Sequence, residues 1–143
     1  MDKPSDNLTF IVDDDPIFRK ILQKYLENIG FKKLMVFEGG SECIEYLKLK
    51  PYIVFLDYQM DDMNGKQVLK EIMRREPNTV VIMISSQEDV TNAINTLKYG
   101  AFDYIVKGEN EFESIQVTLA RVERLQQLLD AKPTKWYLKL FGR

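Results

Sequence analysis

Five short apolar runs, each followed by a segment with helical periodicity, constrain the fold of this 143-residue chain more than any other feature. The runs lie at residues 8–12, 34–37, 53–56, 80–84 and 104–106. Several of them are nearly continuous in Ile, Val, Leu and Phe, which is typical of strands buried on both faces of a parallel sheet. The pattern therefore predicts five strands alternating with five helices.

The segments between these runs carry apolar residues at helical spacing and helix-terminating residues at their ends. The first has Asp15 as an N-cap, Pro16 at the first helical position and Gly30 as its stop. Further helices are expected at about residues 41–49, 68–73, 90–97 and 112–125. Strands that alternate with such helices imply right-handed crossovers, so we predict a doubly wound α/β sandwich.

Charge and composition limit the partners and the compartment. A net charge of −2 and a pI near 5.3 provide no basic field for DNA or RNA, so we expect no direct nucleic-acid partner. The single Cys43 has no intramolecular partner, the N-terminus lacks the apolar segment of a secretory signal, and no apolar run approaches the roughly 20 residues that span a bilayer. We expect a cytoplasmic location.

Polar residues stand at the ends of four predicted strands. Asp13 and Asp14 follow the first strand, Asp57 ends the third, Ser85 ends the fourth and Lys107 follows the fifth. The carboxyl ends of parallel strands lie along one edge of the sheet, where open α/β sheets place their ligand crevice. The sequence therefore predicts that four separate segments converge on one site.

The chemistry of these side chains favours phosphoryl transfer with a hard metal ion. Neighbouring carboxylates repel one another, and Mg²⁺ relieves this repulsion by accepting their oxygens. The chain has no His and one Cys, which makes a zinc site improbable. A carboxylate can attack a phosphoryl group, while Lys107 and the hydroxyl of Ser85 hold the phosphoryl oxygens.

Four segments, FIVDDDP, VFLDYQMDDMNG, VVIMISS and GAFDYIVK, occur together in an order and spacing that resemble the receiver domain of bacterial response regulators. The resemblance covers about residues 8–129 and is to stand-alone, chemotaxis-type members. It implies a flavodoxin-like (βα)5 fold with a five-stranded parallel sheet in the order 2-1-3-4-5. It also divides the chain into a receiver domain at residues 1–130 and a basic, aromatic tail at residues 131–143.

The resemblance implies a phosphoacceptor and a metal site. Asp57 would accept the phosphoryl group. Asp14 and Asp57 would bind Mg²⁺ through their carboxylates, Asp13 would act directly or through water, and Gln59 would contribute its backbone carbonyl.

The resemblance further implies a switch. Ser85 and Lys107 would hold the phosphoryl oxygens, and Tyr104 would turn inward when Ser85 moves towards them. Gln59 and Gln87, each two residues beyond a site residue, border the path of the attacking water in this family. They would tune how long the aspartyl phosphate lasts.

Two positions depart from the usual pattern of the family. Gly108 follows the lysine where a proline is usual, which predicts a looser or differently aimed loop. Asp61 stands where many members have proline, and we expect Asp61 and Asp62 to be solvated turn residues, with an effect on metal affinity as the alternative.

The implied partners are other signalling proteins. A sensor histidine kinase or a histidine phosphotransfer protein would donate the phosphoryl group, since this chain has no His. The chain would pass the group on or bind an unknown downstream target, with a homodimer through helix 4, strand 5 and helix 5 as a further option. We expect no enzyme activity beyond catalysis of its own phosphorylation and dephosphorylation.

Two other functions remain open from the sequence. The first is a pseudo-receiver, a constitutive protein-binding module that keeps the fold without the chemistry. The second is a haloacid-dehalogenase-like hydrolase with an Asp nucleophile, which Gln59 disfavours because such enzymes carry their acid/base Asp at that position. For the tail, the open alternatives are an amphipathic peptide that docks into a partner groove or at an anionic membrane surface, a segment packed on its own domain, a frayed terminus and a truncated linker.

Overall fold

The computed structural model describes residues 3–86 and 89–131. Its strands form one parallel sheet in the order β2-β1-β3-β4-β5. The strands are β1 (Thr9–Val12), β2 (Leu34–Phe37), β3 (Ile53–Asp57), β4 (Val80–Ser85) and β5 (Asp103–Val106). The predicted fold class and strand order are therefore confirmed.

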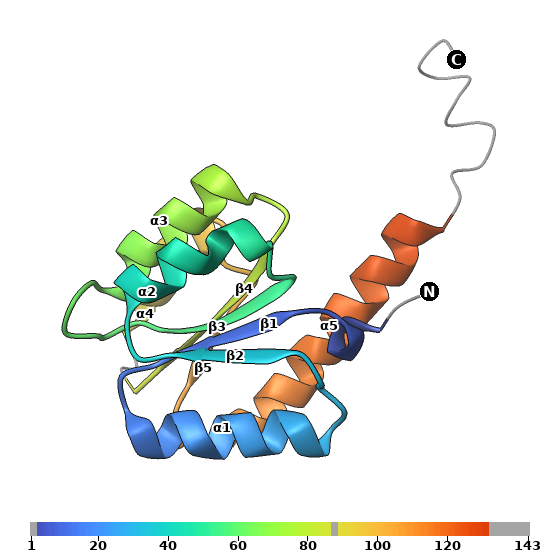
Figure 1. Cartoon of the computed structure of the whole chain (residues 1–143), viewed down its shortest axis with the longest axis horizontal. Coiled ribbons are helices and arrows are strands. Elements are labelled where there is room, and N and C mark those ends of the chain that lie inside the picture. The colour runs from blue at the N-terminus through green and yellow to red at the C-terminus, as the bar shows by residue number, and fades with distance from the viewer. Residues whose placement is uncertain (1–2, 87–88, 132–143) are drawn as a thin grey trace, which may run out of the picture.

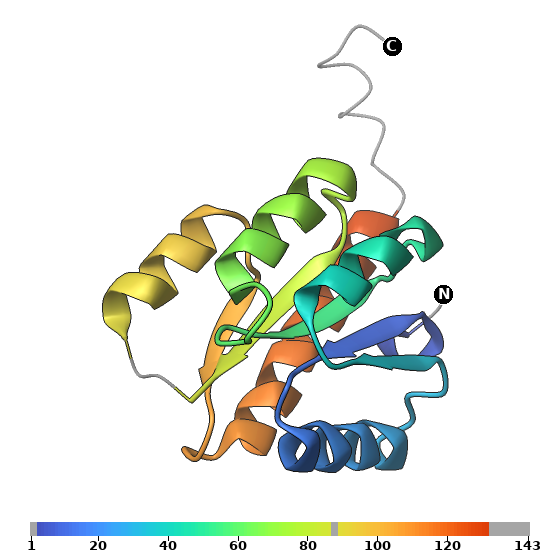
Figure 2. The same cartoon turned by 60° about the vertical axis from the view of Figure 1, so that its left-hand side comes forward.

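Helices cover both faces of the sheet (Figure 1, Figure 2). One face carries α1 (Pro16–Asn28) and α5 (Glu111–Asp130). The other carries α2 (Gly40–Glu45), α3 (Gly65–Arg75) and α4 (Val90–Lys98). Among the described residues, no helix has the length and apolar character needed to cross a membrane.

The described residues also form two short 3-10 helices, η1 (Pro4–Asp6) and η2 (Tyr46–Leu49). The helix expected at residues 41–49 is thus α-helical only in its first part and tightens into η2. It ends at Lys50, which has a φ of 57° and precedes Pro51. A proline disfavours the helical region for the residue before it, so the chain leaves the helix here.

The core consists of two apolar layers separated by the sheet. Successive strand residues point to opposite faces, so Phe10 packs under α2 and α3, and Ile11 packs under α1 and α5. Both side chains are fully buried. This two-sided burial explains the continuous apolar runs of the sequence.

The start of α1 has the caps that the sequence predicts. The side chain of Asp15 accepts hydrogen bonds from the backbone N–H groups of Ile17 and Phe18, and Pro16 occupies the first turn. This cap fixes the direction in which the chain leaves β1, and thereby the loop that carries Asp13 and Asp14.

In α4, the apolar side that the periodicity identifies faces outward. Val90 is 70% exposed and Ile94 is 47% exposed, while the buried residue of this helix is Thr96. The helix lies at the end of the sheet, beside the edge strand β5. Periodicity thus predicts the helix but not which side of it is covered.

Candidate functional site

Strand register places the acidic residues at the same level of the sheet. Val12 pairs with Leu56, so Asp13, which follows β1, and Asp57, the last residue of β3, lie side by side. Their carboxylates and that of Asp14 each offer an oxygen within 4.8 Å of the others. The predicted convergence of these three residues is what the structure shows.

Both central carboxylates are removed from water. Asp13 is 2% exposed and Asp57 is 5% exposed, while Asp14 is partly buried. Three oxygen donors at this spacing, in a chain without His, match the ligands that Mg²⁺ prefers over zinc. The residues present therefore fit a hard divalent cation.

Lys107 directly follows β5, and its side chain reaches the carboxylates. Its backbone N–H donates to the carbonyl of Ser85 at 2.8 Å, which fixes the chain at the end of β5. Its Nζ lies 2.9 Å from Oδ2 of Asp13 and 3.8 Å from Oδ1 of Asp57. The same Nζ lies 4.3 Å from the centre of the Phe18 ring, so an apolar wall on α1 limits its movement.

The environment raises the pKa of Asp57 to about 7. Burial is the main cause, and repulsion from the Asp13 carboxylate adds to it. The positive charge of Lys107 and a backbone hydrogen bond from Gln59 act in the opposite direction. The charge of Lys107 therefore does not offset these effects on Asp57, and additional positive charge would favour its ionised form.

The turn into α3 depends on a close backbone approach beside Asp57. The N–H of Gly65 donates to the carbonyl of Tyr58 at 2.6 Å. A Cβ at Gly65 would come within 2.5 Å of the Asp57 carbonyl oxygen and 2.8 Å of the Tyr58 Cα. Only glycine allows this approach, which holds the loop after β3 close to the site.

Asp62 is exposed, as expected of a solvated turn residue, but it also makes hydrogen bonds that the sequence does not predict. Its carboxylate accepts hydrogen bonds from the backbone N–H groups of Gly40, Ser41 and Met63 at 3.1, 2.9 and 2.8 Å. Desolvation acts to raise the pKa of Asp62, but the hydrogen bonds, with that of Ser41 strongest, outweigh it and lower the pKa. Asp61 is exposed as well.

Two residues implied in the switch lie on neighbouring strands, Ser85 in β4 and Tyr104 in β5. Ser85 is fully buried at the end of β4. Tyr104 is half-buried and packs against the core layer under α2 and α3. The pKa of Tyr58 is raised by burial and, to a smaller extent, by Tyr104, which places these two rings near one another. Gln87 lies outside the described residues.

The backbone conformation at position 108 favours glycine over proline. Its φ of 87° is one that L side chains rarely adopt, and its N–H donates to Oε2 of Glu111 at 3.0 Å in the first turn of α5. Proline offers neither this φ nor an N–H group. The structure contains no cis peptide bond among the described residues.

Arg19 is a site neighbour that the sequence did not reveal. Its Nη1 donates to the backbone carbonyl of Asp13 at 2.7 Å, and its Nη2 lies 3.4 Å from Oε1 of Glu38. The Arg19 side chain is only 15% exposed. No signal in the sequence separates this arginine from the basic residues that α1 exposes.

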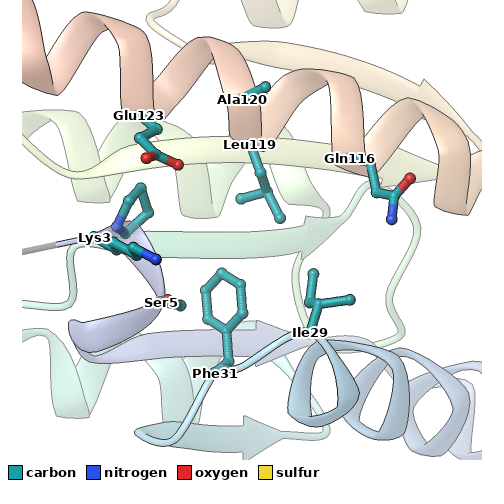
Figure 3. A pocket seen from close by; sticks show the side chains of 9 residues that line it. Lys3, Ser5, Ile29, Phe31, Gln116, Leu119, Ala120 and Glu123 are labelled. Carbon is teal, nitrogen blue, oxygen red and sulfur yellow. The ribbon is translucent and has the colours of Figure 1, made fainter.

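A separate pocket of about 390 Å³ lies at the opposite edge of the sheet (Figure 3). Ile29, Phe31 and Leu119 line it, together with residues of η1 and further residues of α5. These segments precede β1 and β2 or lie in the middle of α5. The pocket is therefore distinct from the carboxylate site.

The fold and the site define a class: a doubly wound α/β domain with three carboxylates and one lysine at the carboxyl edge of its sheet. The sequence matches the family described as response regulator receiver domain over residues 9–119, and the chain belongs to this family. It is a receiver domain of two-component signal transduction.

Two relatives match most of this chain but different shares of their own length. The chain is 38% identical over 98 residues to the chemotaxis protein CheY of Thermotoga maritima, covering 68% of this chain and 82% of that protein. It is 31% identical over 121 residues to the DNA-binding transcriptional regulator NtrC of Escherichia coli, covering 84% of this chain but only 26% of that regulator.

Solved structures agree with this assignment. The CheX–CheY–BeF3–Mg²⁺ complex of Borrelia burgdorferi superposes with a TM-score of 0.74 at 29% identity, covering 80% of this chain and 87% of that one. The signal receiver domain of the LuxO repressor protein of Vibrio parahaemolyticus gives a TM-score of 0.75 at 25% identity, with coverage of 88% and 98%.

Proposed function

We propose that this receiver domain accepts a phosphoryl group on Asp57 while Asp13, Asp14, Asp57 and the backbone carbonyl of Gln59 hold Mg²⁺. The observation that carries the proposal is the buried Asp57 carboxylate within reach of two further carboxylates and of Lys107. Family membership supports it, since the acidic cluster occupies the carboxyl edge where such sheets bind ligands.

The transfer itself needs a nucleophile and compensation of charge. One Asp57 oxygen would form a bond to phosphorus while the bond between phosphorus and the donor breaks. Bound Mg²⁺ supplies charge neutralisation on the phosphoryl oxygens. Lys107 would move its Nζ from Asp13 towards the new phosphoryl group, because the metal then compensates the carboxylate of Asp13.

The signal would follow from the charge that phosphorylation adds. A phosphoryl group carries between one and two additional negative charges and strong acceptor oxygens. Ser85, buried at the end of β4, would donate a hydrogen bond to it, and Tyr104 would occupy the space that Ser85 vacates. The phosphorylated state is then a shift between two packings of β4, α4 and β5.

The lifetime of this state would depend on residues near the attacking water. Gln59 is exposed beside Asp57, and Gln87 stands two residues beyond Ser85 in the sequence. An amide orients or obstructs water without taking its proton. The chain would therefore catalyse only its own phosphorylation and dephosphorylation.

The partners would be proteins. A sensor histidine kinase or a histidine phosphotransfer protein would supply the phosphoryl group, and a downstream protein would read it. The exposed apolar side of α4, with Val90, Ile94 and Leu97, is a candidate surface for this target or for a second copy through α4, β5 and α5. We place this signalling in the cytoplasm, with residues 1–130 as the receiver domain and residues 131–143 as a tail.

Mass spectrometry of the intact protein tests the proposal. Wild-type protein and Asp57→Asn are incubated with phosphoramidate, with and without Mg²⁺. We expect one added phosphate only in the wild type and only with the metal. Equal phosphate addition to Asp57→Asn would overturn the assignment of the phosphoacceptor.

A further inference from the structure

We propose that Asp62 is a positioning residue for the phosphoryl site: it ties the loop at residues 58–64 to the amino end of α2 and thereby fixes the main chain at Gln59. The inference rests on the proposed function of Asp57 and deepens it. It assigns a role to a residue whose carboxylate accepts hydrogen bonds from the backbone of Gly40, Ser41 and Met63.

The contacts of Asp62 join two distant segments. Its Oδ1 accepts from the N–H of Gly40 and from that of Met63, while its Oδ2 accepts from the N–H of Ser41. Gly40 and Ser41 are the first residues of α2, whose own N-cap residue, Gly39, makes no side-chain cap. Asp62 therefore satisfies N–H groups that the start of α2 leaves without a helical partner.

The Asp62 carboxylate lies directly against the backbone of Gly39. A Cβ at Gly39 would come within 2.7 Å of Oδ2 of Asp62. A Cβ at Gly40 would overlap the Val68 side chain and approach the Met63 Cβ at 3.3 Å. Two consecutive glycines thus let the loop after β3 lie directly against the start of α2.

The loop that Asp62 holds is the one that begins at the phosphoacceptor. At its α3 end it is fixed by Gly65, whose N–H donates to Tyr58 at 2.6 Å. The backbone of Gln59 makes a hydrogen bond to Asp57. Gln59 therefore lies between an anchor at Tyr58 and an anchor at Asp62, and loss of the second anchor would free its main chain.

Asp61 offers a matched control on the same loop. It carries the same charge and, like Asp62, lines a surface hollow of about 440 Å³ that also includes Asp14 and Arg19. Asp61 and Asp62 are both exposed, but the hydrogen bonds to α2 are those of Asp62. A loss of charge near the metal site is common to both Asp→Ala variants, whereas loss of the anchor is specific to Asp62.

Hydrogen exchange of the magnesium-free protein tests the anchor by itself. In Asp62→Ala we expect the amides of Gly40, Ser41 and Met63 to exchange about tenfold faster or more, because each loses its acceptor. In Asp61→Ala they should keep the wild-type rates. Unchanged rates in Asp62→Ala would overturn the proposal.

A second variant disturbs the anchor without removing a charge. Gly39 has a φ of −156°, which any residue adopts, so Gly39→Ala adds only a Cβ that collides with the Asp62 carboxylate. We expect faster exchange at the same amides. This variant also keeps the proposal testable if Asp62→Ala does not fold.

Titration with Mg²⁺, followed by calorimetry, tests the positioning role. Asp62→Ala should weaken binding about five- to tenfold, and Asp61→Ala about twofold through charge alone. Equal weakening by both variants would show a charge effect only and overturn the positioning role. If the wild-type protein binds no Mg²⁺, the proposed function fails, and the anchor is judged by hydrogen exchange alone.

Discussion

The ammonium group of Lys107 lies 2.9 Å from Oδ2 of Asp13, so the lysine at the end of β5 forms its shortest ion pair with the acid that follows β1. The distance to Oδ1 of Asp57 is longer, at 3.8 Å. The lysine therefore compensates both acids from a position between β1 and β3, close enough to reach a group attached to Asp57.

Replacement of Lys107 tests this arrangement. Lys107→Met should slow phosphorylation by phosphoramidate about 10²-fold, because it removes the side-chain cation that stabilises the developing charge. The rate is measured by intact mass over time. Lys24→Met, an exposed change on α1, is the control and should keep the wild-type rate. A normal rate in Lys107→Met would contradict the role of the lysine.

Because the pKa of Asp57 is raised, we expect the free energy of unfolding to depend on pH. The pKa of Asp57 is about 7 in the folded chain, against an ordinary value of 3.8, so the folded chain binds this proton more tightly than the unfolded chain. The fold then loses stability as the pH rises from about 4 to about 7, and the loss is complete above that range.

Asp57→Asn removes this cost because the amide does not ionise. In magnesium-free buffer at pH 8 the variant should be more stable by about 2 to 4 kcal/mol, and near pH 4 the difference should vanish. Urea denaturation across this pH range measures it. A constant difference at all pH values would show that ionisation of Asp57 is not its cause.

Replacement of Gly65, at the turn into α3, should lower the free energy of unfolding. Gly65→Ala places a Cβ against backbone atoms of Asp57 and Tyr58, which cannot move aside as a flexible side chain would. We expect a loss of about 2 to 3 kcal/mol in the free energy of unfolding, measured with urea. Gly108→Ala meets open space and should cost only about 1 kcal/mol, through its φ of 87°.

A pair of isoleucines tests whether the exposed side of α4 serves binding rather than folding. Ile94→Ala should change the free energy of unfolding by less than about 0.5 kcal/mol, because Ile94 is half-exposed. Ile115→Ala, in the buried stripe of α5, should cost about 2 to 5 kcal/mol. We expect Ile94→Ala to weaken self-association or target binding of the phosphorylated protein, measured by ultracentrifugation; unchanged association would exclude α4.

The sequence predicts the sheet and the central site because both follow from local patterns. Continuous apolar runs identify buried parallel strands, and the ends of such strands share one edge, so Asp13, Asp57 and Lys107 meet without knowledge of any loop. The cap at Asp15 is equally local, since its partners are the next turn of the same helix.

Features that depend on long-range contacts were not predictable in this way. The hydrogen bonds of Asp62 are not predictable because its partners Gly40 and Ser41 lie more than twenty positions earlier in the chain. The buried position of Arg19 depends on the path of β2, and the exposed side of α4 depends on its place beside an edge strand. Sequence periodicity carries no information about such neighbours.

Chemical trapping of the phosphorylated residue tests the central claim most directly. Borohydride reduces an aspartyl phosphate to homoserine, and peptide sequencing by mass spectrometry then locates the reduced residue. After incubation with Mg²⁺ and phosphoramidate we predict homoserine at position 57 alone, and none when the metal is left out. Homoserine at position 13 or 14, or no homoserine at all, would contradict the assignment of Asp57 as the phosphoacceptor.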